Sequence, residues 1–153
     1  MAVRTYDPRE VIVSFGAPGS GGVQIVGYAD GTYINVQPQD DAYASVSGAD
    51  GEVARARSND GRAQIAITLM QTSDSNDYLS GLYNADRAGN TGVRAISIVE
   101  RGSGRTIIAS ASAWVARLPD VGYSKGVETR EWRIDTAGMS WFIGGNNSEG
   151  AAA

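Results

Sequence analysis

The sequence predicts a mainly β protein, a β-sandwich or barrel with one flanking α-helix at about residues 75–87. Twenty glycines and only four prolines separate short apolar runs, which is typical of a chain with many strands and tight turns. Several runs alternate apolar with polar or small residues, the period of a strand that buries one face. A length of 153 residues with 42% hydrophobic content suits a single domain whose core needs no disulfide or metal.

The first half of the chain contains five expected strands, at residues 10–15, 23–28, 32–37, 52–57 and 64–69. In the last of these, Ile65, Ile67 and Leu69 share the inward face. Asp7-Pro8 blocks strand pairing before the first strand, so we expect residues 1–9 to form an N-terminal arm.

Three turn signals separate these strands: Ala29-Asp30-Gly31, Asp50-Gly51 and Asn59-Asp60-Gly61. Each contains residue types that accept a left-handed backbone, so each predicts a chain reversal between neighbouring strands. Strands 23–28 and 32–37 are therefore expected to pair in a β-meander.

Residues 16–22 are rich in glycine, and two interpretations compete. Glycine-rich loops can wrap an anion with backbone amides. A phosphate loop also needs a Lys-Ser/Thr pair and an immediate helix, whereas a strand beginning at Val23 follows here. A flexible hairpin turn is the favoured interpretation.

Residues 40–50 predict an extended loop, because Tyr43 and Val46 are its only sizeable apolar residues. Asp40, Asp41 and Asp50 are conceivable calcium ligands. The ligand spacing and closing Glu of an EF-hand are missing, however, and a solvated loop is favoured.

A single amphipathic helix is predicted from Ser75 to Arg87, with Ser73 or Ser75 as the N-cap. Its apolar residues recur at spacings of three and four, which predicts one stripe that covers an end or face of the β-structure: Tyr78, Leu79, Leu82 and Tyr83. Residues 88–90 end the helix. Ordinary packing explains the tyrosines better than an aromatic ligand site.

Strands return in the second half, at residues 93–99, 105–111, 113–118, 129–136 and 139–143. Trp114 and Trp141 are expected to pack in the core. A flexible C-terminal tail is expected at residues 146–153.

In strand 129–136, alternation places Trp132 and Ile134 on one face. Glu131, Arg133 and Asp135 occupy the other face, which is either solvated or, in a closed ring, turned toward a channel.

The composition excludes several kinds of chemistry. The chain has no histidine and no cysteine, so Ser-His-Asp and Cys-His catalysis and thiolate metal sites cannot occur. We expect no catalytic residue, no cofactor and no metal. A net charge of -4 argues against tight nonspecific binding to nucleic acid, which requires many Lys and Arg. The sequence lacks a signal peptide and a membrane-spanning apolar run, so a soluble chain made in a cytoplasm is expected.

Seven short blocks resemble the tail tube protein family of contractile-tailed bacteriophages, which is related to the tube proteins of type VI secretion. The blocks are YADGT at 28–32, GADGEV at 48–53, SND at 58–60, LMQTS at 69–73, SND at 75–77, REW at 130–132 and FIGGN at 142–146. The glycine-rich stretch 16–22 and the tail from Ser148 depart from the family pattern.

The resemblance implies a structural virion protein whose protomers close into hexameric rings and stack into the inner tail tube, a conduit for DNA ejection. Implied partners are other copies of the chain, the sheath outside, the tape measure protein and DNA inside without sequence-specific binding, and baseplate and terminator proteins at the ends. No membrane partner is implied. The tube would be assembled in the bacterial host cytoplasm.

Two sets of residues are the candidate sites for this role. Contacts between protomers or rings are expected at Asp40, Asp41, Tyr43, Val46, Asp50 and Glu52. Lumen-facing positions are expected at Glu131, Arg133 and Asp135, and the negative net charge predicts that acidic side chains dominate the inner wall.

Two other functions stay open at this point. A glycan hydrolase could work with two carboxylates alone, although the sequence singles out no pair. A monomeric glycan-binding or adaptor β-sandwich is the second. Turnover of peptidoglycan would favour the hydrolase. The absence of rings or rods in electron micrographs would favour the monomeric binding or adaptor protein.

Overall fold

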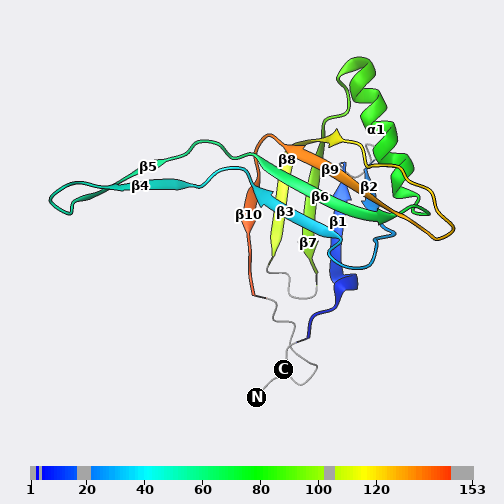
Figure 1. Ribbon diagram of the computed structural model, residues 1–153, viewed down its shortest axis with the longest axis horizontal. Helices are drawn as coiled ribbons and strands as arrows, with labels where there is room; N and C mark the ends of the chain where they lie inside the picture. The colour runs from blue at the N-terminus through cyan, green and yellow to red at the C-terminus, as the bar shows by residue number, and fades with distance from the viewer. Residues whose placement is uncertain (1–2, 4, 17–21, 102–105, 146–153) are drawn as a thin grey trace.

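A computed structural model describes residues 3, 5–16, 22–101 and 106–145. After a 3-10 turn at Pro8–Glu10, its elements are β1 (Val11–Phe15), β2 (Val23–Ile25), β3 (Ile34–Pro38), β4 (Tyr43–Ser47), β5 (Val53–Arg57), β6 (Ala63–Met70), α1 (Ser75–Gly89), β7 (Arg94–Glu100), β8 (Ile107–Arg117), β9 (Thr129–Thr136) and β10 (Ser140–Phe142). The predicted mainly β architecture with one flanking helix is confirmed (Figure 1).

Eight strands form an antiparallel sheet in the order β2-β1-β7-β8-β9-β6-β3, with β10 also paired to β8. The first part of β8 pairs with β7 and β10, and its last part pairs with β9. Register shifts in the pairings of β8 with β7 and with β9 allow the sheet to bend there. As a result, β3, β6 and β9 cross over β1, β7 and β8, as in an orthogonal sandwich (Figure 1).

The core fills the space between these two halves. Alternate residues of β1, β6, β7 and β9 point into it, among them Val13, Phe15, Ile65, Ile67, Leu69, Ile96, Ile98, Trp132 and Ile134. The predicted inward faces of residues 64–69 and 129–136 are therefore confirmed. The Trp132 indole Nε1 donates to Asn76 Oδ1 at 2.8 Å, which satisfies its one donor.

The helix α1 lies against one edge of the sandwich (Figure 1). Leu79 and Leu82 are buried, and Tyr78 and Tyr83 pack against the core, which confirms the predicted stripe. The N-cap differs, because Asp74 occupies that position without a side-chain cap. Ser73 Oγ nevertheless accepts the Ser75 amide at 3.2 Å, as a capping side chain would. Both serine hydroxyls also bond to Val26, since the chain between β2 and β3 passes beside them.

Two predicted hairpins are wrong. Residues 29–31 do not join a meander, because β2 and β3 lie at opposite ends of the strand order. Gly27, with φ of 78°, breaks the extended run, and the chain crosses the sandwich to reach β6. Residues 59–61 likewise do not pair their flanking strands, since β5 pairs with β4 whereas β6 pairs with β3 and β9.

Residues 105–111 and 113–118 were expected as two strands but form the single strand β8 from Ile107. The strand does not end at Ser112. The Ser110 hydroxyl bonds to the Ser112 backbone where the register between β7 and β8 shifts, and so bridges that shift. Trp114 is not a core residue. It pairs with Asp135 and so lies on the opposite face from Val115, while Trp141 does pack against the core.

Other expectations fall partly outside the described residues, namely the C-terminal tail at 146–153 and most of the glycine-rich stretch 16–22. The strands on either side of that stretch, β1 and β2, pair antiparallel. The expected loop at residues 40–50 is wrong in form, because it contains strand β4. Among the described residues, no helix combines the length and apolar character needed to cross a bilayer.

Candidate assembly interface

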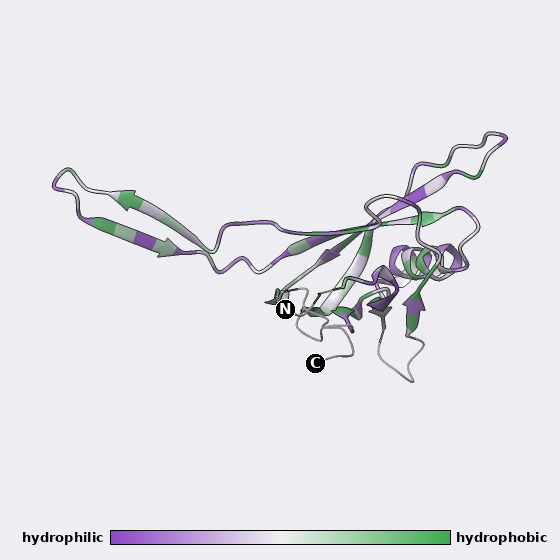
Figure 2. Ribbon diagram, turned by 90° about the horizontal axis from the view of Figure 1, so that it is seen from below, coloured by the Kyte–Doolittle hydropathy of each residue, from purple (hydrophilic) through white to green (hydrophobic). Residues whose placement is uncertain are grey.

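Strands β4 and β5 form a separate two-stranded hairpin that projects from the sandwich as a long arm (Figures 1 and 2). The pairing runs from Tyr43 opposite Arg57 to Ser47 opposite Val53. The predicted turn at Asp50-Gly51 is confirmed: Gly51 has φ of 86° and its amide donates to the Gly48 carbonyl at 3.1 Å. Every residue of both strands is exposed.

The two faces of this arm differ in chemistry. Because side chains alternate along each strand, the register gives one wholly apolar face: Ala44, Val46, Ala54 and Ala56. We call these four residues the apolar face. On the other face, the Arg55 guanidinium lies 4.2 Å from the centroid of the Tyr43 ring, a cation–π contact. Small apolar side chains on a flat ribbon allow another surface to approach closely.

Hydrogen bonds join the two chains of the arm to each other at its base. The Ser58 amide donates to the Ala42 carbonyl at 2.8 Å, and the Ser58 hydroxyl donates to Asp40. Asp60 accepts from Arg62 Nε at 2.9 Å, and this hydrogen bond lowers the pKa of the Asp60 carboxyl. These contacts hold the two chains together where they leave the sandwich.

The six predicted contact residues are spread along the arm. Asp40 and Asp41 lie at its base, and Tyr43 and Val46 lie on opposite faces. Asp50 and Glu52 lie at its tip. The strand between Asp41 and Asp50 separates the conceivable calcium ligands, and no acidic cluster suited to a metal occurs among the described residues.

The predicted channel-facing residues lie together on the outer face of β9. Asp135 is opposite Gln64 and Trp114, and Arg133 is opposite Arg117. Arg133 Nε lies 3.3 Å from Asp135, and Arg117 lies 3.9 Å from Asp120. Glu131 and Asp135 therefore share this region with two arginines, and the expected dominance of acidic groups in a channel stays a prediction.

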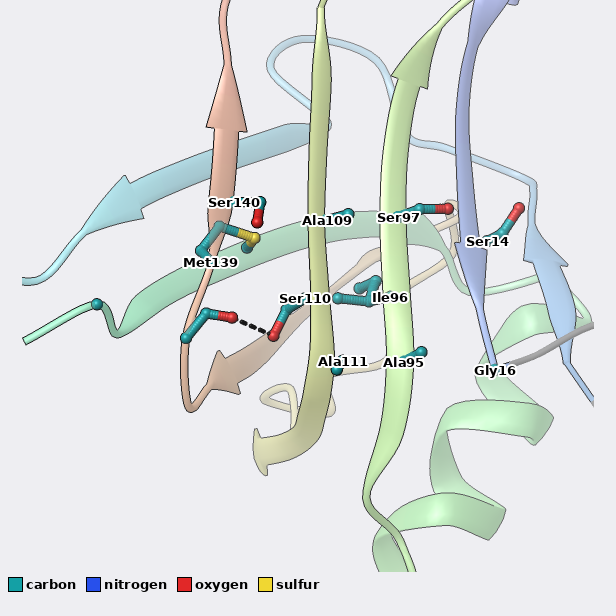
Figure 3. Close-up of a pocket in the computed structure, with 12 residues that line it drawn as sticks. Ser14, Gly16, Ala95, Ile96, Ser97, Ala109, Ser110, Ala111, Met139 and Ser140 are labelled. Carbon is teal, nitrogen blue, oxygen red and sulfur yellow. Dashed lines mark hydrogen bonds between the residues drawn. The ribbon is translucent and has the colours of Figure 1, made fainter.

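A groove of about 800 Å³ lies on the outer face of β1, β7, β8 and β10 (Figure 3). Small residues line most of it, including Ser14, Ser97, Ala109 and Ser140. The Ser110 hydroxyl donates to the Gly138 carbonyl, so that hydroxyl is held by the fold. The lining contains no carboxylate, and a glycoside-cleaving pair therefore has no place in this groove.

Sequence reasoning missed the apolar face and one buried cation, Arg130. A signal for the first exists in VARAR at 53–57, where alanines alternate with charged or larger residues. For Arg130, the alternation of the strand predicts an inward-facing side chain on the same face as Trp132. The alternation does not predict which residues surround the guanidinium, because those residues come from other segments.

The fold is similar to that of chains in solved structures of phage-like particles. The chain matches a subunit of the tail of an empty gene transfer agent particle with a TM-score of 0.60 at 15% identity, over 91% of this chain and 100% of the other. It matches a subunit of the anti-feeding prophage tube-terminating cap with a TM-score of 0.58 at 12% identity, over 94% and 95% of the two chains.

Residues 3–144 match the family described as Bacteriophage PhiTE tail tube protein, and the chain belongs to that family. It is also 28% identical over 144 residues to structural protein ORF10 of Pseudomonas phage KPP10, which covers 93% of this chain and 83% of that protein. The resemblance seen in the sequence is thereby confirmed. The protein is a structural virion component of a phage tail.

Proposed function

We propose that this protein closes into hexameric rings, and that the rings stack into the inner tail tube through which DNA is ejected. The observation that carries the proposal is the apolar face of the β4–β5 arm, which is exposed to solvent in the isolated chain. The C6 symmetry of the gene transfer agent tail supports a six-membered ring.

An isolated two-stranded hairpin is marginally stable in water, because half of its hydrogen-bonding edges and both of its faces are solvated. An arm that buries Val46 and its three alanine neighbours against another copy gains the stability that its own chain does not supply. The arm lies at one extremity of the molecule (Figure 1). Its contact is therefore head-to-tail, the type that generates rings and filaments.

The arm makes these contacts along its whole length: Asp40 and Asp41 at the base, Tyr43 and Val46 on the two faces, and Asp50 and Glu52 at the tip. The outer face of β9, with Glu131, Arg133 and Asp135, lines the bore. Each arginine there lies near a carboxylate, so the wall offers passing phosphates few free cations.

The remaining partners follow from a tube: the sheath outside, the tape measure protein and DNA inside, and the baseplate and terminator at the ends. The protein acts without enzymatic activity or cofactor, and the tube assembles in the host cytoplasm before it becomes part of the virion. The pairing of arginines with carboxylates on the outer face of β9 supports a tube wall that lets DNA pass without binding it.

Substitution of one apolar-face residue tests the role of the arm. Val46→Asp places a charge in the contact and should abolish rings and rods in negative-stain images, with an unchanged thermal melt, because Val46 is 68% exposed in the monomer. Ser45→Asp is the matched control, since that position faces Arg55 on the other side of the arm.

Sedimentation velocity should show wild type and Ser45→Asp as large assemblies and Val46→Asp as a protomer. Normal tubes from Val46→Asp at the same concentration would show that the apolar face is not an interface. A wild-type protein that stays monomeric at every accessible concentration would contradict the tube itself.

A further inference from the structure

A second pocket lies at the extremity of the molecule opposite the arm. It is about 410 Å³ in volume and is enclosed by the first turns of α1, by β9 and by the segment 118–128 that joins β8 to β9. Figures 1 and 2 both show this segment reaching away from the arm. Its lining combines polar and aromatic side chains: Gln71, Asn76, Ser80, Tyr123, Arg130 and Trp132.

Arg130 is the unusual member of this lining, because it is only 8% exposed and yet has no acidic partner. Among the described residues, no carboxylate lies within 4.0 Å of its guanidinium. The recorded hydrogen bond of the group is from Nη1 to the Thr129 carbonyl at 3.1 Å. Because the other guanidinium nitrogens are not among the buried atoms that lack a partner, they open onto the pocket, and an incoming carboxylate would find charged donors there.

The rim of the pocket is apolar and exposed. Tyr123 is 82% exposed, and its ring centroid lies 5.5 Å from the Arg130 guanidinium carbon. Val121 and Leu118 stand beside it, exposed as well. Arginine, tyrosine and tryptophan around a desolvated centre are the composition of an interface hot spot. The site therefore suits a carboxylate carried on a protein segment better than a free anion.

We propose that this pocket receives the Glu52 carboxylate at the tip of the β4–β5 arm of a second copy of the chain. The inference rests on the proposed assembly and specifies where the arm docks. The arm and the segment 118–128, part of which lines the pocket, reach in opposite directions (Figures 1 and 2), an arrangement that suits a head-to-tail contact between identical copies.

The tip chemistry favours Glu52 over Asp50. Asp50 Oδ1 accepts the Glu52 amide at 3.5 Å and so belongs to the turn. The Glu52 backbone carbonyl accepts the Gly48 amide at 2.7 Å, which fixes its backbone, while its side chain forms no ion pair within the described residues. Glu52 thus offers a carboxylate on a pre-formed turn, and Arg130 offers the matching fork of donors.

Cysteine cross-linking gives a direct test of proximity, because the chain contains no cysteine of its own. Copies carrying Ala49→Cys at the tip are mixed with larger, tagged copies carrying Val121→Cys on the rim, assembled, and oxidised mildly. A covalent heterodimer is expected on a non-reducing gel. Tagged copies with Arg87→Cys, an exposed position on α1, are the control and should give none.

Two neutral variants test the charge pair. Glu52→Gln and Arg130→Met should each raise the protein concentration needed for assembly by at least about tenfold, because each leaves a charge unpaired in the contact. Asp30→Asn, which neutralises an exposed carboxylate away from the arm, is the matched control and should assemble like wild type. Circular dichroism checks the fold; should Arg130→Met fail to fold, Glu52→Gln and the cross-link still decide.

The outcomes separate the two proposals. Normal assembly by Glu52→Gln, or wild-type-like tubes without the Ala49–Val121 cross-link, would overturn this docking site and leave the tube in place. Loss of assembly in Arg130→Met alone would show that another group supplies the carboxylate and would equally overturn the assignment to Glu52. A wild-type chain that never assembles would remove the tube and this contact together.

Discussion

At the scale of single residues, the close approach of Gly27 to Ser73 holds together segments that are far apart in sequence. Gly27 has φ of 78°, and a Cβ there would lie 2.5 Å from Ser73 Oγ and 2.6 Å from Ser73 Cβ. The Ser73 hydroxyl donates to the Val26 carbonyl at 2.6 Å, and the Val26 amide donates to Ser75 Oγ at 3.0 Å. Residues 26–27 are therefore bonded to the start of α1, and only glycine fits.

Gly27→Ala should lower the free energy of unfolding much more than Gly31→Ala. Both positions have a positive φ, near 80–90°, which costs a residue with a side chain about 1–2 kcal/mol. Gly31 has open space around its Cβ position, whereas Gly27 must displace Ser73 and break its bonds. Urea denaturation of the two variants measures the difference. Equal losses would mean that Ser73 moves aside without cost.

At the scale of elements, the helix stripe has the clearest energetic consequence. Leu79 is fully buried and Leu82 is 7% exposed, so Leu79→Ala and Leu82→Ala should each destabilise the protomer by about 2–5 kcal/mol. Asn84→Ala, on the exposed side of α1, should change the free energy of unfolding by less than about 0.5 kcal/mol. Denaturant melts at one protein concentration test this prediction. If the leucine variants lose no more free energy of unfolding than Asn84→Ala, then α1 packs through another face.

The sequence predicts elements better than their pairing, and the reason is physical. Residues 129–136 and 64–69 alternate strongly because one face of each is buried, so their strands and inward residues could be read directly. Pairing of β3 with β6 depends on contacts between distant segments, and the local turn residues at 29–31 do not predict this pairing. Strand β4 was missed because its only sizeable apolar residues are Tyr43 and Val46 and all its residues are exposed, whereas the equally exposed β5 was predicted from the turn signals on both sides of it.

For the candidate interface, too, local features could be predicted from the sequence, whereas features that depend on pairing between segments could not. The location of the contacts in residues 40–52 could be proposed from their lack of core residues, and that proposal stays a prediction. The apolar face could not be found from residues 40–50 alone, because half of it belongs to β5 and depends on the register between the two strands. The pocket at Arg130 needs three segments brought together by the fold.

At the scale of the whole molecule, net charge is a poor guide to local charge. The chain carries -4 overall, yet the outer face of β9 and the end of β8 have two carboxylates and two guanidiniums. Arg133 is held by Asp135 at 3.3 Å. If this face lines the bore, its carboxylates matter because they keep the neighbouring arginines from binding phosphate.

Reversal of both carboxylates should therefore convert the bore into a DNA-binding surface. In Glu131→Lys/Asp135→Lys, each protomer would present four cations and no partner for Arg133 on this face. DNA release from virions built with this variant should slow, and added salt should restore the rate, because screening weakens contacts between cations and phosphates. Asp30→Lys/Asp77→Lys makes the same change in net charge at exposed positions away from the face and should eject DNA normally.

The measurement is dye-reported DNA release at low and high ionic strength, after electron microscopy has shown tails of normal length for both variants. Unchanged release by the β9 variant at low salt would place Glu131 and Asp135 outside the bore.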